Sequence, residues 1–488
     1  MATNNTKQAA WVAIGSFCSF GIGIVSSMIL SRFLSKGDYG TYHQVLYVYG
    51  VLLTVFTLGL PKAYSYFLPR VKPEECKSLI NKLTFLFIIL GAIFSALLFF
   101  GATFIAKILN NPDLAGAMRI FSIVPLLLMP TMGLEGILST FKKTQFLALY
   151  TICTRLLMLL CIALPVMFFG LGYKEAIIGF VISSAITCLL AIILKNYPVR
   201  KFPKNACDTT YSEIFKFSLP LLYASIFGII ISSADQFFIS RYFGKETFAI
   251  FANGSMELPF ISMVVGACAT VLSPIFSRME HEQVDFQKEV FPLWISVFEK
   301  TAKLIYPILA FCWVFSEPIM IVLFGQQYAE SSIYFKIKTV TNLFNLIIFA
   351  PLLINTGKVK IYSNTHAITA VVLVSAEYAS ILLFNSPYAI AITSLLCNIG
   401  KIFCLLIVAA RIFNVKVYRL FPIATMLEII IPSLIFLYGS LIVTKQINLA
   451  PLTTVLFGLS IYAISFGLYA YFRRINYLSI IKPLFSNK

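Results

Sequence analysis

The amino-acid sequence predicts an all-α protein that crosses a membrane many times. Of its 488 residues, 59% are hydrophobic and only 12% are charged, whereas a soluble domain carries about 25% charged residues. Apolar runs of about 20 residues recur along the chain, and a helix of that length spans the hydrocarbon core of a bilayer. The composition therefore excludes a soluble fold and favours a polytopic helical membrane protein.

The apolar runs predict about fourteen transmembrane helices. The segment before the first of them has no small-residue cleavage site of the secretory type, so we expect it to be a short tail. The spans lie near residues 10–31, 42–61, 83–105, 119–139, 146–169, 175–194, 217–239, 248–272, 303–324, 337–355, 362–384, 388–410, 420–443 and 450–471.

The basic residues predict the orientation of these spans. Of the 38 Lys and Arg residues, 27 fall on the side of the N-terminus, 10 fall on the other side, and Arg155 lies within a span. Cytoplasmic loops collect Lys and Arg, so we expect both termini in the cytoplasm. This asymmetry explains most of the net charge of +18 without a nucleic-acid partner, and membrane lipids with anionic headgroups are the expected partners of these loops.

The sequence lacks the usual signatures of catalysis and metal binding. The longest predicted loops, 62–82, 195–216 and 273–302, are too short to fold as soluble domains, and no GxGxxG, GxxxxGKS or HExxH motif occurs. The ten cysteines form no CxxC pair and the three histidines lie far apart, so neither a disulfide framework nor a metal site is indicated. We therefore expect no enzyme, no catalytic residues, no metal and no cofactor.

Two halves of the chain repeat one pattern. ILSRFLSKGDYGTY (29–42) returns as FISRYFGKETFAIF (238–251), each with a Ser-Arg pair where an apolar run ends. FGATFIAKILNNPDLAGAMRIF (100–121) returns in outline as SEPIMIVLFGQQYAESSIYFKI (316–337). Spans 1–6 and 7–12 are therefore predicted to be two copies of one six-helix unit.

The repeat predicts three parts of the chain. They are an N-terminal lobe (1–205), a C-terminal lobe (206–415), and an addition of two transmembrane helices with a cytoplasmic tail (416–488). Both copies begin on the same side of the membrane because six is even. Parallel repeats of this kind enclose a cavity and transport by rocking one half against the other.

Four segments, in order, resemble a known family. They are ILSRFLSKGDYGTYHQV (29–45), LGLPKAYSYFLPR (58–70), ADQFFISRYFGKETFAIFANGSMELPF (234–260) and EPIMIVLFGQQY (317–328). They are similar to the polysaccharide-transport branch of the multidrug/oligosaccharidyl-lipid/polysaccharide (MOP) exporters, which includes the O-antigen (Wzx-type) flippases. The resemblance covers nearly the whole chain and implies a V-shaped, MATE-like pair of six-helix lobes.

The resemblance also implies a function. The expected cargo is an oligosaccharide linked to undecaprenyl diphosphate, such as the repeat unit of the O-antigen of lipopolysaccharide or of another surface polysaccharide. A flippase of this kind would lie in the cytoplasmic (inner) membrane of a bacterium and carry the cargo from the inner to the outer leaflet. A polysaccharide polymerase and assembly proteins are the protein partners that such a role implies.

Such a cargo demands a cationic cavity, because an ionised diphosphate is very costly to place in hydrocarbon. Arg155 is the first candidate substrate-binding residue, since it lies about ten residues into span 5, near the middle of the bilayer. An intramembrane arginine indicates function by default. The alternative is a structural ion pair with a membrane acid such as Glu135, Asp235 or Glu377.

Three further cations are candidate substrate-binding residues. Lys62 follows Pro61 near the inner-leaflet level, where it would meet an incoming diphosphate or extend to the cytoplasmic headgroups. Arg32 and Arg241 end the apolar runs of spans 1 and 7. They would act in release or gating at the outer mouth, or anchor the chain at the outer headgroups.

Carboxylates within the spans are candidates for ion coupling. Asp235, Glu257 and Glu377 are the leading ones, and Glu428 in span 13 is of the same class. A buried carboxylate can exchange a proton or hold a sodium ion, so coupling to H⁺ or Na⁺ is expected on this basis. Salt bridges to lysines of the same lobe are the alternative.

Two other transport functions stay open. An ion-coupled multidrug antiporter of the sister branch would share the two-lobe design, but it should carry carboxylates in the first lobe to bind organic cations. Span 1 has no acidic residue and span 5 has an arginine, which favours an anionic cargo. An exporter of a lipid-linked peptidoglycan, teichoic or teichuronic precursor would use the same kind of cavity.

Overall fold

The computed structural model describes residues 2–203, 205–475 and 477, and this part of the chain folds into helices without a strand. Twelve of the described helices are long and apolar enough to cross a membrane, or thirteen if one bent pair counts as a single span. The predicted fold class is thereby confirmed. Most of the predicted cytoplasmic tail, including Lys482 and Lys488, lies outside the described residues.

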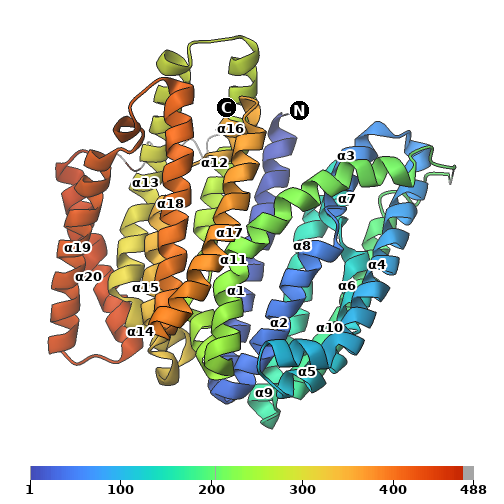
Figure 1. Cartoon of the computed structure of the whole chain (residues 1–488), viewed down its shortest axis with the longest axis horizontal. Helices are drawn as coiled ribbons and strands as arrows, with labels where there is room; N and C mark the ends of the chain where they lie inside the picture. Colours follow the sequence, from blue (N-terminus) through green and yellow to red (C-terminus); the bar gives the residue numbers. More distant parts are fainter. Residues whose placement is uncertain (1, 204, 476, 478–488) are drawn as a thin grey trace. The chain divides into compact units, whose positions relative to one another are not determined.

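The chain forms two compact units, Met1–Ala249 and Ile250–Lys488. The first unit runs from blue to green in Figure 1. The division into lobes at residues 205 and 415 stays a prediction. The elements of the first unit are α1 (Ala2–Phe33), α2 (Lys36–Phe56), α3 (Pro61–Phe67), η1 (Leu68–Arg70), α4 (Pro73–Ile108), α5 (Asp113–Phe121), α6 (Val124–Leu128), η2 (Met129–Thr131), α7 (Leu134–Thr140), α8 (Thr144–Met158), η3 (Leu159–Ala163), α9 (Leu164–Phe169), α10 (Tyr173–Asn196) and most of α11 (Tyr211–Gly254).

The second predicted span is bent and longer than expected. Its helix α2 ends at Phe56, a turn follows, and α3 begins at Pro61. Proline starts a helix readily but cannot continue one, because it lacks the N–H group. Leu58 (φ 49°) and Gly59 (φ 71°) in the turn adopt left-handed backbone conformations. The span therefore extends from residue 36 to residue 70 and encloses Lys62, which the sequence analysis placed at its end.

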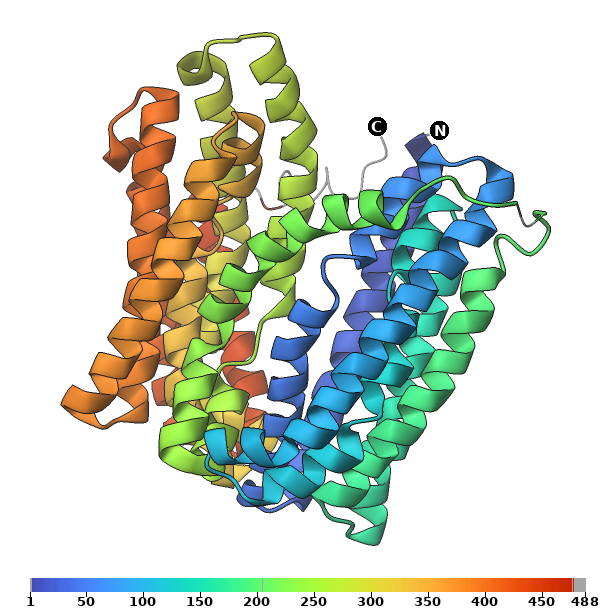
Figure 2. The same cartoon turned by 45° about the vertical axis from the view of Figure 1, so that its right-hand side comes forward.

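The eighth predicted span is also broken. Gly244 (φ 81°, ψ 175°) interrupts α11, and the chain leaves helical geometry again before α12 begins at Pro259. Glu257 therefore lies in a connecting segment, and its predicted place inside a span is wrong. Figure 2 shows that α11 bends along its course, and Pro220 within it removes one helical hydrogen bond.

Helices α13, α19 and α20 pack together in the second unit. The hydroxyl of Tyr462 on α20 lies 2.9 Å from Ser433 Oγ on α19 and 3.2 Å from the carbonyl oxygen of Pro307 on α13. The elements of this unit are α12 (Pro259–His281), η4 (Phe286–Val290), α13 (Phe291–Val314), α14 (Ser316–Phe324), η5 (Gln326–Tyr328), α15 (Ser331–Phe344), α16 (Ala350–Asn355), α17 (Val359–Phe384), α18 (Pro387–Phe413), η6 (Val417–Leu420), α19 (Ile423–Gln446) and α20 (Pro451–Phe472).

The predicted span 337–355 is split into α15 and α16. Residues 345–349 between them are not helical, and Pro351 lies in the first turn of α16 (Ala350–Asn355), where its missing N–H group breaks no helical hydrogen bond. The break frees backbone carbonyls that must be satisfied inside a membrane. Trp294 Nε1 donates to the carbonyl of Ile348 (3.0 Å), and the Tyr306 hydroxyl donates to that of Leu343 (3.0 Å). Two side chains of α13 thus stabilise the broken span.

Candidate functional site

Arg155 lies near the middle of the membrane-spanning segment 144–169. Its side chain is exposed, and its Nε donates a 3.0 Å hydrogen bond to Ser19 Oγ of α1. Within the described residues of the first unit, no carboxylate lies at ion-pair distance from Arg155. The ion pair with Glu135 that the sequence left open is therefore not formed among the residues that the structure describes.

Helix α8 carries Arg155 against α1 at very short range. A Cβ atom at Gly15 would lie 2.9 Å from Ala148 Cα, so the two backbones touch only because residue 15 is a glycine. This close approach brings Ser19 one turn further along α1 within hydrogen-bond distance of the guanidinium. The placement of Arg155 thus follows from helix packing rather than from a charged partner.

The segment after Arg155 is a π-helix, Leu159–Ala163. Pro165 follows it and has no N–H group for the carbonyl of Cys161, which favours this local widening. A Cβ at Gly179 on α10 would lie 2.0 Å from that carbonyl oxygen, so only glycine allows α10 to pack there. Single-turn π segments are frequent at functional sites of helical proteins.

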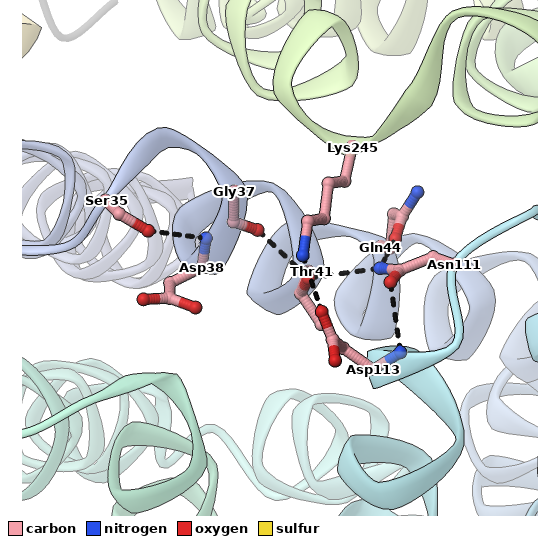
Figure 3. Close-up of polar contacts among 8 residues, drawn as sticks. All are labelled: Ser35, Gly37, Asp38, Thr41, Gln44, Asn111, Asp113 and Lys245. Carbon is pink, nitrogen blue, oxygen red and sulfur yellow. Dashed lines mark hydrogen bonds and ion pairs between the residues drawn. The ribbon is translucent and has the colours of Figure 1, made fainter.

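A buried polar cluster joins α2, the turn before α5, and α11, and Figure 3 shows its members Thr41, Gln44 and Asn111. Gln44 Nε2 donates to Ser240 Oγ at 2.7 Å, and Asn111 Nδ2 donates to Gln44 Oε1 at 2.6 Å and to Thr41 Oγ1 at 3.0 Å. All four side chains are buried. Buried amide groups are costly unless paired, so this network fixes one arrangement of the three elements.

Charged residues of the same region are also engaged. Lys245 Nζ lies 2.5 Å from Asp113 Oδ2, as Figure 3 shows. Arg241 donates to the carbonyl of Ile108 at the end of α4, where a cation complements the helix dipole. Arg32 is exposed in the last turn of α1. The structure thus brings Arg241 to a structural contact, and a role of Arg32 or Arg241 in cargo release stays a prediction.

Lys62 and the candidate coupling acids lie in different surroundings. Lys62 is exposed on α3, Asp235 is half-buried on α11, and Glu257 is exposed in the segment before α12. Glu377 is fully buried on α17, within a membrane-spanning helix. Asp235 belongs to the first unit, Glu257 and Glu377 belong to the second, and the coupling role of all three stays a prediction.

Two ionisable residues of the second unit, Glu428 and Lys401, have polar partners. Glu428 Oε1 pairs with Arg473 Nη2 at 2.7 Å, and this hydrogen bond and the negative charge of Glu428 raise the pKa of Arg473. Glu428 is therefore a structural partner. Lys401 lies at the middle of α18, and its Nζ donates to Asn398 Oδ1 at 2.9 Å.

The sequence analysis missed the buried cluster around Gln44. The repeat singled out the Ser-Arg pair that contains Ser240 but gave no sign of its partner, because neutral amides carry no charge signal. The sequence offers only one related signal, which is that a glutamine and an asparagine stand beside apolar runs.

Comparison with known proteins agrees with this fold. The family described as polysaccharide biosynthesis protein matches residues 29–333. The succinoglycan biosynthesis transport protein ExoT of Rhizobium meliloti (strain 1021) is 23% identical over 329 residues, which cover 66% of this chain and 63% of that protein, less than two thirds of its length. The capsular polysaccharide biosynthesis protein CapF of Staphylococcus aureus is 22% identical over 371 residues, covering 74% of this chain and 86% of that protein.

Solved structures show the same architecture. The lipid II flippase MurJ in an inward closed conformation aligns with a TM-score of 0.72 at 16% identity, covering 94% of this chain and 98% of that one. An inward-facing multidrug resistance MATE family transporter of the MOP superfamily aligns with a TM-score of 0.63 at 13% identity, covering 85% and 98%. At such identities the likeness establishes the fold. The resemblance found in the sequence motifs is confirmed, and the chain belongs to the polysaccharide biosynthesis protein family.

Proposed function

We propose that this protein moves an oligosaccharide linked to undecaprenyl diphosphate from the inner to the outer leaflet of a bacterial cytoplasmic membrane. The observation that carries the proposal is Arg155, an exposed cation at mid-span that forms no ion pair with a carboxylate among the described residues of the first unit. A guanidinium is too costly to leave facing lipid. It therefore faces a polar cavity, where an anionic group of the cargo supplies the missing partner.

Flipping requires stabilisation of the polar head and no bond breaking. The polyprenyl tail stays in lipid, while the sugars and the diphosphate need polar surroundings during the passage. Arg155 offers two parallel N–H donors of the kind that suits phosphate oxygens. Alternating access of two lobes, as in transporters built from repeats, would then expose the cavity first to the cytoplasm and then to the outside.

The direction of movement has an electrical contribution. An interior-negative potential favours outward movement of an anion by about 2.3 kcal/mol per charge and 100 mV, if the charge crosses the whole field. A cavity cation reduces this gain because it neutralises part of the moving charge. Coupling to H⁺ or Na⁺ through Asp235, Glu257 or Glu377 is proposed as the additional source of energy.

The names of similar proteins support the class of cargo. Two relatives are described by succinoglycan and capsular polysaccharide biosynthesis, and the structure with a TM-score of 0.72 is a lipid II flippase. Each of these descriptions refers either to a sugar polymer or to a lipid-linked precursor of one. We place both termini in the cytoplasm, in keeping with the distribution of basic residues.

The test is a strain that lacks this protein. Its lipids are extracted and searched for a diphosphate-linked oligosaccharide, and an impermeant enzyme added to spheroplasts reports which leaflet holds it. Build-up on the inner leaflet, relieved by the intact chain, is the expected result. Absence of any accumulated lipid-linked sugar, together with sensitivity to cationic drugs, would replace the proposal by the multidrug antiporter.

A further inference from the structure

A lysine lies fully buried among the helices of the first unit. Lys195, in the last turn of α10, has only 1% of its surface exposed. The sequence analysis counted it among the cations of a cytoplasmic loop, which is wrong. An ammonium group removed from water is costly unless it is paired, so its surroundings require an explanation.

The surroundings of Lys195 contain hydroxyl groups and aromatic rings. Lys195 Nζ lies 3.1 Å from the Tyr64 hydroxyl and 3.5 Å from Thr84 Oγ1, and these two hydroxyls lie 3.0 Å apart. The ammonium also lies 4.7 Å from the centroid of the Tyr64 ring and 5.9 Å from that of Phe87. Among the described residues, no carboxylate forms an ion pair with Lys195.

Tyr64 connects this site to the short helix α3. Its ring stacks with Phe87 and lies against the start of α7, where a Cβ at the N-cap residue Gly133 would lie 2.0 Å from Tyr64 Cδ2. A Cβ at Gly136 would lie 2.7 Å from Ser65 Oγ of the same short helix. Tyr64 therefore makes several of the contacts of α3 with its neighbours, and Lys195 donates to the hydroxyl of this side chain.

Helix α3 is also held by other contacts, since Ala63 is fully buried and the Tyr66 ring stacks on Phe217 of α11 with centroids 4.1 Å apart. It follows the turn with left-handed residues Leu58 and Gly59, where the hydrogen-bond ladder of span 2 is interrupted. Lys62, two residues before Tyr64, is exposed while Tyr64 is buried, because positions two apart point to different faces of a helix. The orientation of Tyr64 thus sets the direction in which Lys62 points.

We propose that Lys195 is a positioning residue that locks Tyr64, and with it α3, in the one orientation that presents Lys62 to the diphosphate of the cargo. The role of Lys62 rests on the proposed function. A methionine would fill the place of Lys195 at lower cost. Unlike a methionine, the ammonium donates a hydrogen bond to the Tyr64 hydroxyl. This hydrogen bond is the advantage of a buried lysine over a methionine at this position.

The first experiment measures α3 directly and does not depend on transport. Hydrogen exchange by mass spectrometry is compared for wild type, Lys195→Met, Tyr64→Phe and the control Lys201→Met, which makes the same change at an exposed site. We expect amides of residues 61–67 to exchange about tenfold faster in the first two variants, with other helices unchanged. Unchanged exchange in α3, or faster exchange throughout the first unit, would overturn the positioning role.

The second experiment joins the positioning role to transport. The probe is the undecaprenyl-diphosphate-linked oligosaccharide extracted from the deletion strain and reconstituted with purified protein. Lys195→Met and Lys62→Ala should each slow flipping about tenfold, and the double variant should be no slower than Lys62→Ala, because both act through one contact. Multiplying defects would refute the link to Lys62.

The two experiments separate the two proposals. If wild type moves no lipid-linked oligosaccharide, the proposed function fails, while faster exchange of α3 in Lys195→Met would still establish the positioning role. If Lys195→Met does not fold, Tyr64→Phe and Thr84→Val, which each remove one hydroxyl, provide the same comparison.

Discussion

Gln44 and Ser240 are hydrogen-bonded at 2.7 Å although 196 residues separate them in the chain. Gln44 lies two residues after the first copy of the repeated motif (29–42), and Ser240 begins the Ser-Arg pair of the second copy. Helix α2 is therefore hydrogen-bonded to the part of α11 in which the second copy of the motif begins. Asn111 completes the cluster by donating to the other atom of the Gln44 amide.

Removing the Gln44 amide should destabilise the first unit. Gln44→Leu leaves Ser240 and Asn111 buried without this partner, and each unsatisfied polar group costs roughly 1–3 kcal/mol. We expect a lower thermal unfolding midpoint in detergent, followed by intrinsic fluorescence. Gln145→Leu makes the same change at an exposed position and should have little effect. Equal midpoints for wild type and Gln44→Leu would show that the cluster contributes no stability.

Gly40 should not tolerate a methyl group. A Cβ there would lie 2.0 Å from the backbone carbonyl oxygen of Lys245, so α2 and α11 would have to separate. Such overpacking costs about 1–3 kcal/mol. Gly50 on the same helix has open space at this position and is the matched control. If Gly40→Ala and Gly50→Ala unfold at the same temperature, the close approach of the two helices is refuted.

The ion pair between Lys245 and Asp113 should matter much less. Their side chains are 32% and 52% exposed, and exposed pairs contribute about 1 kcal/mol or less. Asp113→Asn is expected to lower the unfolding midpoint slightly in low salt and not at all in high salt, because salt screens exposed charges. A large decrease of the unfolding midpoint that persists in high salt would contradict the small contribution expected of this ion pair.

Arg155→Gln should abolish most transport without unfolding the protein. Hydrogen bonds to charged groups contribute roughly 1.5–3 kcal/mol, so we expect flipping to slow by about 10- to 100-fold. Arg155→Lys keeps the charge and should retain part of the rate. The control is Arg119→Gln, since Arg119 is also exposed and also donates to a hydroxyl, Thr103 Oγ1 at 3.1 Å. Normal flipping by Arg155→Gln would reduce Arg155 to a packing role.

The proposed orientation can be checked with reporter fusions. Alkaline phosphatase inserted at Asn448, between α19 and α20, should be active because that turn is expected outside the cell. A fluorescent protein inserted at Val415, before α19, should fold in the cytoplasm. The reverse pattern would invert the whole topology, because consecutive spans alternate in direction.

The sequence predicted the fold well because its signals are strong over long windows. Apolar runs of membrane length and the asymmetry of Lys and Arg indicate helices and sides of the membrane, and both are properties of many residues together. The breaks at Gly59, Gly244 and Asn345 were not predicted. They depend on local backbone geometry and on donors such as Trp294 that arrive from another helix.

The candidate site was predicted only in part. Arg155 is recognisable because a charge within an apolar run is rare. Lys195 was misplaced because it ends such a run, where sequence alone cannot distinguish a loop cation from a buried one. Gln44 and Asn111 carry no charge, so nothing in one sequence marks them as a network.

The contact of Tyr462 with Pro307 has a consequence for synthesis. The two residues lie 155 positions apart, so α13 leaves the ribosome and enters the bilayer long before α20 exists. Until then the carbonyl of Pro307 and the hydroxyl of Ser433 lack their hydrogen bonds to the Tyr462 hydroxyl. Lipid covers the face that α20 later occupies. The packing of α13, α19 and α20 is therefore completed only when α20 inserts, and a chain that stops before α20 would leave this face of α13 and α19 covered by lipid alone.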